Sequence, residues 1–368
     1  MSDDREVPAL PDVPTVRKGQ TDVALSKKEF DKRFDERFYD PAFEAVSDEI
    51  ARARDVAWES YHEYRKSPRT EKAGPGFADP EHPLPIEWLA ARRAIHDAQQ
   101  AHDAPGAKRR ILVICASART DQTCPGEMSK TFRFANLAKE IVGADAECEC
   151  DFLDLSALTA EYGRVIYPCK GCVSTAMPLC HWPCSCYPNH AIGQVNDWMN
   201  EIYSRWVAAH GVIVVTPVYW YQAPAVLKLM IDRLVCADGG NPDPTTTHGK
   251  HPDEAKAIEV KGWDYPRHLA GRAFGVFVHG DAAGAETLRR SLTDWMLDMH
   301  LVQAGRAVID RYVGYMDEYA RSHDALDADE AVQEEMRNVA REVVATVKAQ
   351  RDGRYDEPGR DLKDPRPK

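Results

Sequence analysis

The sequence predicts an α/β fold: a doubly wound, five-stranded parallel sheet preceded by an α-helical extension. From residue 108 onward, short apolar runs rich in β-branched residues alternate with amphipathic helical patterns. Parallel strands are buried on both faces, so they read as continuous apolar runs, and the connections between them are helices. Because ligands of such sheets bind beyond the carboxyl ends of the strands, the loops that follow the strands are the places to seek function.

The first 107 residues predict helices and no clear strand. Their start is rich in Pro and charge, which is typical of disorder. Asp40 and Pro41 provide an N-cap and a first-turn proline for one helix. A Pro- and Gly-rich linker over residues 66–85 then precedes a second helix predicted at 86–101. We expect this extension to pack on the main domain or on a second subunit.

The main domain, residues 108–350, contains the strands and the helices between them, and a loose polar tail covers residues 351–368. The predicted strands are Ile111–Cys115, Cys148–Leu153, Gly211–Thr216, Ala273–His279 and a weaker Gly305–Ile309. The predicted helices are one whose apolar face runs from Ile192 to Val207, then Pro224–Leu234, Thr287–Met299 and Glu330–Val347.

Composition excludes several classes of function. The net charge of −12 disfavours a general nucleic-acid partner, because phosphate binding needs a basic surface. The sequence contains no run of 18 apolar residues, so it predicts no membrane span. The N-terminus does not resemble a secretory signal, and we therefore expect a cytoplasmic protein. In a reducing compartment, the ten cysteines point to metal binding, redox chemistry or packing rather than to a disulfide framework.

The loop after the first strand, residues 116–130, is rich in Ser, Thr, Arg and Gly and leads into a helix. Hydroxyls and helix N-terminal amides suit a phosphate group. The loop matches neither the dinucleotide pattern G-x-G-x-x-G nor the P-loop of nucleotide triphosphatases. A turn-rich loop that only caps the helix is the alternative. The best phosphate candidates are Ser117, Arg119, Thr123 and Ser129.

Two further loops follow the third and fourth strands. Residues 216–224 read TPVYWYQAP, and three consecutive aromatic residues at a strand end cannot all belong to the core. The backbone amides of this turn can bond a flat heterocycle and a ring can stack on it, although core packing is the alternative. Residues 279–284, HGDAAG, contain two glycines that allow close backbone approach, or form an ordinary turn.

Taken in order, these loops resemble the flavodoxin-like NADPH-dependent FMN reductase family. The family stretch P-x-Y-x-x-x-x-P-x-x-L-K-x-x-I-D-R matches residues 217–233, and the family's G-S-x-R matches more loosely, with Ala116 in place of Gly. The first loop also carries an extra Cys124-Pro125-Gly126 segment. The resemblance covers residues 108–309.

The resemblance implies a flavodoxin-like fold and bound FMN, with NAD(P)H as co-substrate and the FMN phosphate in the first loop. It implies that the flavin ring lies against the second loop, with the third loop nearby. Dimers are usual in the family, so a homodimer is expected. The residues implied to contact the ring are Pro217, Val218, Tyr219, Trp220, Tyr221, His279 and Gly280.

A separate cluster of cysteines lies between residues 167 and 190. C-x-x-C followed by C-x-x-x-C-x-C can chelate zinc or an iron–sulfur cluster, and it resembles the motif of iron–sulfur flavoproteins, whose spacing is tighter. A thiol–disulfide pair, with Cys169 and Cys172 as the first candidates, and plain structural cysteines are the alternatives. The candidate metal ligands are Cys169, Cys172, Cys180, Cys184 and Cys186.

Three functions follow from these features. The favoured one is an FMN-dependent oxidoreductase that passes electrons from NAD(P)H to a small-molecule acceptor. The acceptor would be a quinone, a nitro- or azo-compound or a flavin. The bound flavin, rather than a catalytic side chain, would carry the chemistry. The second is an iron–sulfur flavoprotein that acts in electron transfer through the cysteines. The third is a non-catalytic binding protein with structural zinc.

Overall fold

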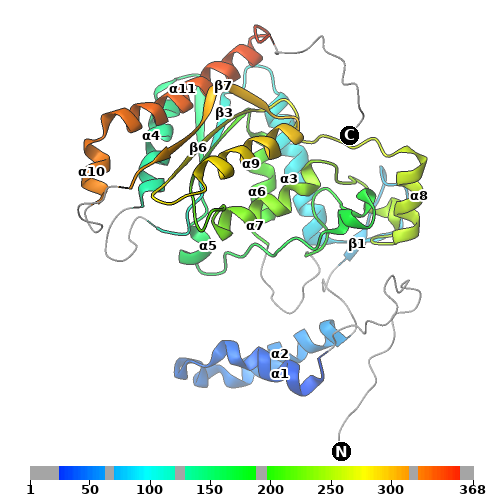
Figure 1. Ribbon diagram of the computed structural model, residues 1–368. Helices are drawn as coiled ribbons and strands as arrows, with labels where there is room; N and C mark the ends of the chain where they lie inside the picture. The colour runs from blue at the N-terminus through cyan, green and yellow to red at the C-terminus, as the bar shows by residue number, and fades with distance from the viewer. Residues whose placement is uncertain (1–24, 63–69, 121–128, 188–196, 315–321, 357–368) are drawn as a thin grey trace, which may run out of the picture.

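The computed structural model of the chain describes residues 25–62, 70–120, 129–187, 197–314 and 322–356. At its centre is a five-stranded sheet with the order β4-β3-β5-β6-β7, in which every neighbouring pair is parallel (Figure 1). All five predicted strands are present, so the doubly wound parallel sheet is confirmed. The strands are β3 Arg109–Cys115, β4 Cys148–Asp154, β5 Gly211–Pro217, β6 Ala273–Gly280 and β7 Val302–Tyr312.

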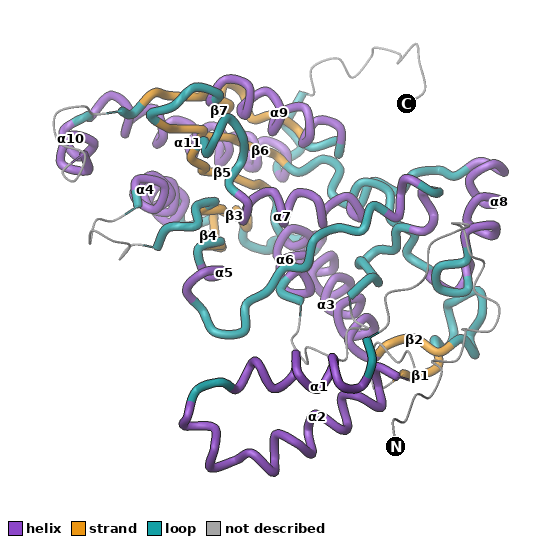
Figure 2. The backbone as a smooth tube through the Cα atoms, turned by 60° about the horizontal axis from the view of Figure 1, so that its bottom comes forward, coloured by secondary structure: helices purple, strands orange, loops and turns teal. Residues whose placement is uncertain are grey.

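Helices cover both faces of the sheet (Figures 1 and 2). Alternate residues of β3 serve the two faces, as the period of a strand requires. Ile111 and Val113 pack toward α4 and α11, whereas Leu112 and Ile114 pack toward the helices of the other face. The helices of the main body are α4 Lys130–Ala144, α6 Met199–Ala208, α7 Ala225–Arg233, α9 Ala285–Asp298 and α11 Glu330–Arg351.

Helix α3, Ile86–Asp103, packs along α6 and contributes Ile95 to the core of the main body. The second helix predicted in the extension therefore lies on the sheet domain. The short helices α5 Ala157–Ala160, α8 Pro252–Gly262 and α10 Ser322–Ala328 complete this part of the fold.

The N-terminal helices α1, Lys27–Asp35, and α2, Ser47–His62, form a hairpin with its own small apolar cluster around Phe30. Asp40 accepts a hydrogen bond from Ala42 N, so its predicted capping role is confirmed, although the turn it caps is a 3₁₀ helix.

The linker predicted at residues 66–85 contains a strand pair that the sequence did not predict. β1, Thr70–Lys72, and β2, Pro83–Pro85, pair in antiparallel fashion. Each strand has three residues, and β2 begins and ends with proline, so neither shows the apolar alternation by which a strand is recognised. The expectation of an extension without strands is therefore wrong at this point. None of the described helices is long and apolar enough to cross a membrane.

Candidate functional site

The three loops selected from the sequence leave the sheet at its carboxyl edge, from the neighbouring strands β3, β5 and β6. The chain runs from β3 to β4 on one side and then crosses to β5 on the other side. The junction between β3 and β5 is therefore the topological switch point, where open α/β sheets bind their ligands.

Ser117 joins the first loop to the second. Its side chain is buried, and its Oγ accepts a hydrogen bond from the backbone N of Arg119 at 3.1 Å. The same Oγ lies 3.4 Å from the hydroxyl oxygen of Tyr219. Because these loops are in direct contact, one ligand can reach both. Thr123, which was also predicted in this loop, lies outside the described residues.

The start of α4 offers donors suited to an anion. Ser129 occupies the N-cap position and is buried, yet its own side chain makes no capping hydrogen bond, and the first turn contains no acidic residue. The Nε of Arg119 is buried and has no hydrogen-bond partner among the described residues. A buried donor without a partner is costly, and the amides at a helix N-terminus favour a phosphate. The residues present therefore fit a phosphomonoester.

The second loop forms a two-residue turn. Tyr219 N donates to Gln222 O and Gln222 N donates to Tyr219 O, each at 2.9 Å. Trp220 has φ 45° and Tyr221 has φ 67°, a conformation that normally selects Asn or Gly. Their side chains are 91% and 60% exposed. The expectation that the three aromatics are not all core is confirmed, and such backbone strain is typical of functional sites.

The third loop contacts the other two through its backbone and through His279. Val218 N donates to His279 O at 2.8 Å, and the Nε2 of His279 lies 2.9 Å from Thr131 Oγ1, in the first turn of α4. Burial, reinforced by the charge of Lys130, lowers the pKa of His279 to about 3, so the imidazole is neutral at pH 7. Its Nδ1 is buried without a hydrogen-bond partner among the described residues.

Two glycines allow the second and third loops to pack closely. A Cβ at Gly280 would lie 2.5 Å from Val218 Cγ1, and a Cβ at Gly284 would lie 2.6 Å from Tyr221 Cα. Both distances are shorter than any real carbon contact, so only glycine fits. Pro217 and Val218 are buried beneath the turn. Where Val218 meets Gly280, the backbone is therefore open to close approach by a flat ring.

Sequence reasoning thus selected the loops but missed Thr131, which orients His279. The only signal was its place two residues after the candidate Ser129. The structure brings Ser117, Tyr219 and the His279 backbone into one connected edge.

The cysteines form a second gathering, and it includes residues that the sequence did not suggest. Cys236 of the turn after α7 joins the predicted five around one small cavity, with Arg233 and Lys250 at its wall. Cys115, Cys148 and Cys236 are buried, as expected of core cysteines, whereas Cys150 is only partly buried. The five predicted residues in this cavity are Cys169, Cys172, Cys180, Cys184 and Cys186.

The thiols are not equivalent. Cys172 Sγ lies 3.4 Å from Cys186 Sγ. The hydrogen bond from Cys186, helped by the charge of Lys250, lowers the pKa of Cys172 to about 7. Burial raises the pKa of Cys180, and the contact with Cys186 followed by burial raises that of Cys184. The pair shown in contact is Cys172 with Cys186, whereas the spacing had favoured Cys169 with Cys172.

The reason is local. Gly171, at φ 64°, begins a 3₁₀ turn over Cys172–Ser174, and Cys169 Sγ instead accepts a hydrogen bond from Gly171 N at 3.3 Å. Among the described residues, no group of three or more His, Cys, Asp or Glu side chains is arranged to hold a metal ion. The metal-site prediction is therefore not supported by this geometry.

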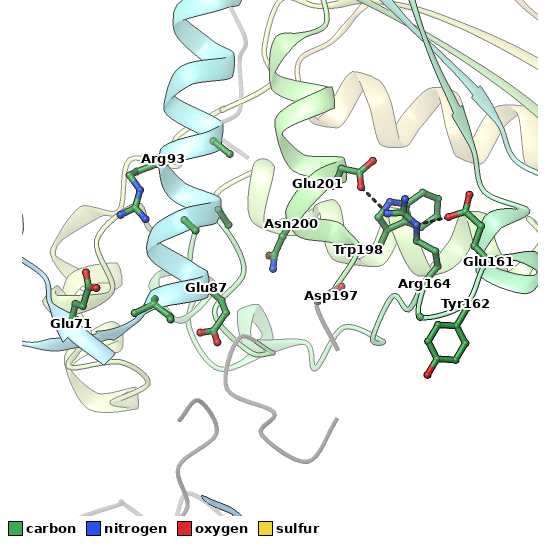
Figure 3. Close-up of a pocket in the computed structure, with 15 residues that line it drawn as sticks. Glu71, Glu87, Arg93, Glu161, Tyr162, Arg164, Asp197, Trp198, Asn200 and Glu201 are labelled. Carbon is green, nitrogen blue, oxygen red and sulfur yellow. Dashed lines mark hydrogen bonds and ion pairs between the residues drawn. The ribbon is translucent and has the colours of Figure 1, made fainter. Parts of the chain in front are cut away.

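A third feature was not anticipated from sequence. A cleft of about 950 Å³ lies between α3 and α6, with side chains of mixed charge around it (Figure 3). Arg164 forms ion pairs with Glu161 and Glu201 at its rim. None of its lining residues belongs to the three loops.

No curated protein matches the chain. Solved structures that align with it include RosB with a bound formylriboflavin phosphate intermediate (12% identity, 67% of this chain and 81% of that chain, TM-score 0.44). An apo NADH:FMN oxidoreductase also aligns, with 15% identity, 68% of this chain and 92% of that chain covered, and a TM-score of 0.37. General stress protein 14 from Treponema denticola in complex with FMN aligns with 12% identity, 66% and 98% of the two chains covered, and a TM-score of 0.32.

The decisive finding is a family model. The model of NADPH-dependent FMN reductases matches residues 109–313, which is more than half of the chain and spans β3 to the end of β7. The protein therefore belongs to the NADPH-dependent FMN reductase family.

Proposed function

We propose that the protein binds FMN at the edge formed by the loops after β3, β5 and β6, and that it passes electrons from NAD(P)H to a small acceptor such as a quinone or a free flavin. The observation that carries this proposal is the 3.4 Å contact between Ser117 Oγ and the Tyr219 hydroxyl. It joins a phosphate-binding loop to a ring-binding turn. The contact of His279 with Thr131 links the adjoining third loop to the first turn of α4.

In this proposal the first loop holds the phosphate. The backbone amides at the start of α4 donate to it, and Arg119 supplies a positive charge through a guanidinium whose Nε has no other partner among the described residues. Ser117 and Ser129 add hydroxyl groups. These groups position the cofactor and take no part in electron transfer.

The second and third loops hold the ring. The Tyr219–Gln222 turn and the Gly280 backbone approach it closely, because Gly280 and Val218 leave no room for a larger side chain. FMN, when bound, supplies the hydride and electron chemistry. Neutral His279 keeps the adjoining interior free of a charge. The exposed rings of Trp220 and Tyr221 offer flat apolar surfaces to an aromatic acceptor.

The homodimer and the cytoplasmic location stay predictions. The iron–sulfur alternative also stays a prediction, since among the described residues no group of three or more His, Cys, Asp or Glu side chains is arranged to hold a metal ion.

The phosphate assignment is tested by comparing FMN with riboflavin, which lacks the phosphate. Wild-type protein should bind FMN more tightly, and Arg119→Met should weaken FMN binding by about tenfold to a hundredfold while leaving riboflavin binding unchanged. Arg290→Met, an exposed arginine of α9, serves as the control and should behave as wild type. Equal losses for both ligands in Arg119→Met would contradict the assignment.

The catalytic assignment is tested by anaerobic mixing of the FMN-loaded protein with NADPH or NADH. We expect the visible absorption of the flavin to bleach, and to return when a quinone is added. A flavin that stays oxidised through many minutes with both nucleotides would refute the reductase function without affecting the FMN site.

A further inference from the structure

The proposed flavin site makes no use of the thiol cluster, which we define as the six cysteines around the cavity beneath the end of α7. These are Cys169, Cys172, Cys180, Cys184, Cys186 and Cys236. Six thiols therefore gather around one cavity.

Within this cluster, Cys172 and Cys186 stand apart. Both are only partly buried, and their Sγ atoms are 3.4 Å apart. A disulfide needs a sulfur–sulfur distance of about 2.05 Å. Side-chain rotations that bring the two sulfur atoms closer by little more than about 1 Å would therefore allow the bond to form. Cys180, Cys184 and Cys236 are buried and less accessible to a reagent.

Lys250 distinguishes the two cysteines of the pair, because its charged group contacts Cys172. Its ammonium Nζ lies 3.8 Å from Cys172 Sγ and is held there by a hydrogen bond of 2.6 Å to the carbonyl oxygen of Leu179. A positive charge beside a thiol favours the nucleophilic thiolate. Cys172 is therefore the attacking sulfur, and Cys186 is the sulfur placed to resolve the product.

A larger cleft adjoins the thiol cavity. A cleft of about 660 Å³ between α7 and α9 shares Cys169 and Val235 with the thiol cavity. Its wall carries the carboxylates of Asp232, Asp294 and Asp298. This acidic wall disfavours anionic reagents, and the cleft has room for a small neutral one.

We propose that Cys172 and Cys186 are a reversible dithiol–disulfide couple that a small neutral hydroperoxide oxidises. The Cys172 thiolate attacks one oxygen of the hydroperoxide, the O–O bond breaks, and the departing hydroxide or alkoxide takes a proton from water to become water or an alcohol. The resulting Cys172 sulfenic acid is attacked by the Cys186 thiol, which forms the disulfide and releases water. Two thiols are oxidised by two electrons and one hydroperoxide is reduced. Two equivalents of a small thiol reverse the reaction and become a disulfide.

The test uses the full-length reduced protein and one equivalent of hydrogen peroxide. After remaining thiols are alkylated, chymotryptic cleavage after Leu179 separates Cys172 from Cys186, and mass spectrometry identifies linked peptides. We expect a Cys172–Cys186 link that dithiothreitol removes. Oxidation of Cys172 to sulfinic acid without a link, a link to another cysteine, or no oxidation would overturn the proposal, as would one equivalent of tightly bound zinc or iron.

Variants test the assigned roles. Cys186→Ser should leave a trappable sulfenic acid at Cys172, and Cys172→Ser should abolish oxidation at this concentration. Cys169→Ser, from the same cavity, is the matched control and should form the link at the wild-type rate. Lys250→Met should slow link formation about tenfold, whereas Lys250→Arg should keep most of the rate. Equal rates in both Lys250 variants would refute the role of the charge. Circular dichroism of each variant verifies folding.

Discussion

Acidification should destabilise the protein through His279, and the size of the effect follows from its burial. The imidazole titrates near 6.5 when unfolded and near 3 in the folded protein. Because the folded pKa is the lower one, the unfolded state binds more protons between these values. The contribution of His279 to stability is therefore complete above pH 6.5, falls as the pH drops below it, and levels off near pH 3.

Between pH 7 and pH 5, this single group should cost about 2 kcal/mol of unfolding free energy. Other buried histidines add to the loss, since burial also lowers the pKa of His210 to about 4. The contribution of His279 alone is therefore isolated by comparing wild type with His279→Gln, which keeps an amide near Thr131 and does not titrate.

The assay is urea unfolding of flavin-free protein at pH 7, 6 and 5, so that bound ligand does not shift the equilibrium. We expect the unfolding free energy of wild type to fall by about 2 kcal/mol more than that of His279→Gln over this range. If the unfolding free energy of His279→Gln falls with pH in parallel with that of wild type, the buried neutral imidazole is not present.

Gly280→Ala should lower FMN affinity at least tenfold in a fluorescence titration, because its Cβ would collide with the loop beneath the ring. The control Gly143→Ala lies in open space on α4. It should leave FMN affinity unchanged and stabilise the helix by about 0.5–1 kcal/mol. Asp197→Asn should cost about 3 kcal/mol in urea unfolding, because it leaves Arg233 buried without the ion pair seen at 2.5 Å; a loss below about 1 kcal/mol would contradict this. Trp220→Asn should raise the thermal unfolding midpoint by relieving positive φ, by an amount equivalent to about 1 kcal/mol; a lowered midpoint would show that the ring, not the strain, dominates.

The sheet was predictable because strands buried on both faces consist of consecutive apolar residues, a pattern that is visible in the sequence. The predicted runs in β3 and β5 are apolar and fully buried, and the structure extends them by only one or two residues. The weak fifth run became β7, Val302–Tyr312, which is longer than predicted and partly exposed, so its sequence carries less apolar pattern.

The candidate site was predictable as loops but not as contacts. A strand end followed by a helix start is visible in sequence, whereas the approach of Tyr219 to Ser117 depends on the order of strands. The thiol cluster shows the same limit. Spacing favoured Cys169 with Cys172, yet folding pairs Cys172 with Cys186 and brings in Lys250 from 78 residues away.

The central claim is that one FMN spans the start of α4 and the Tyr219 turn. A crystal structure of the protein saturated with FMN tests it most directly. The account predicts the phosphate within hydrogen-bond distance of Arg119 and the first amides of α4, with the ring against the Tyr219–Gln222 turn and Gly280. A flavin seated instead in the cleft between α3 and α6, or a phosphate away from α4, would contradict it.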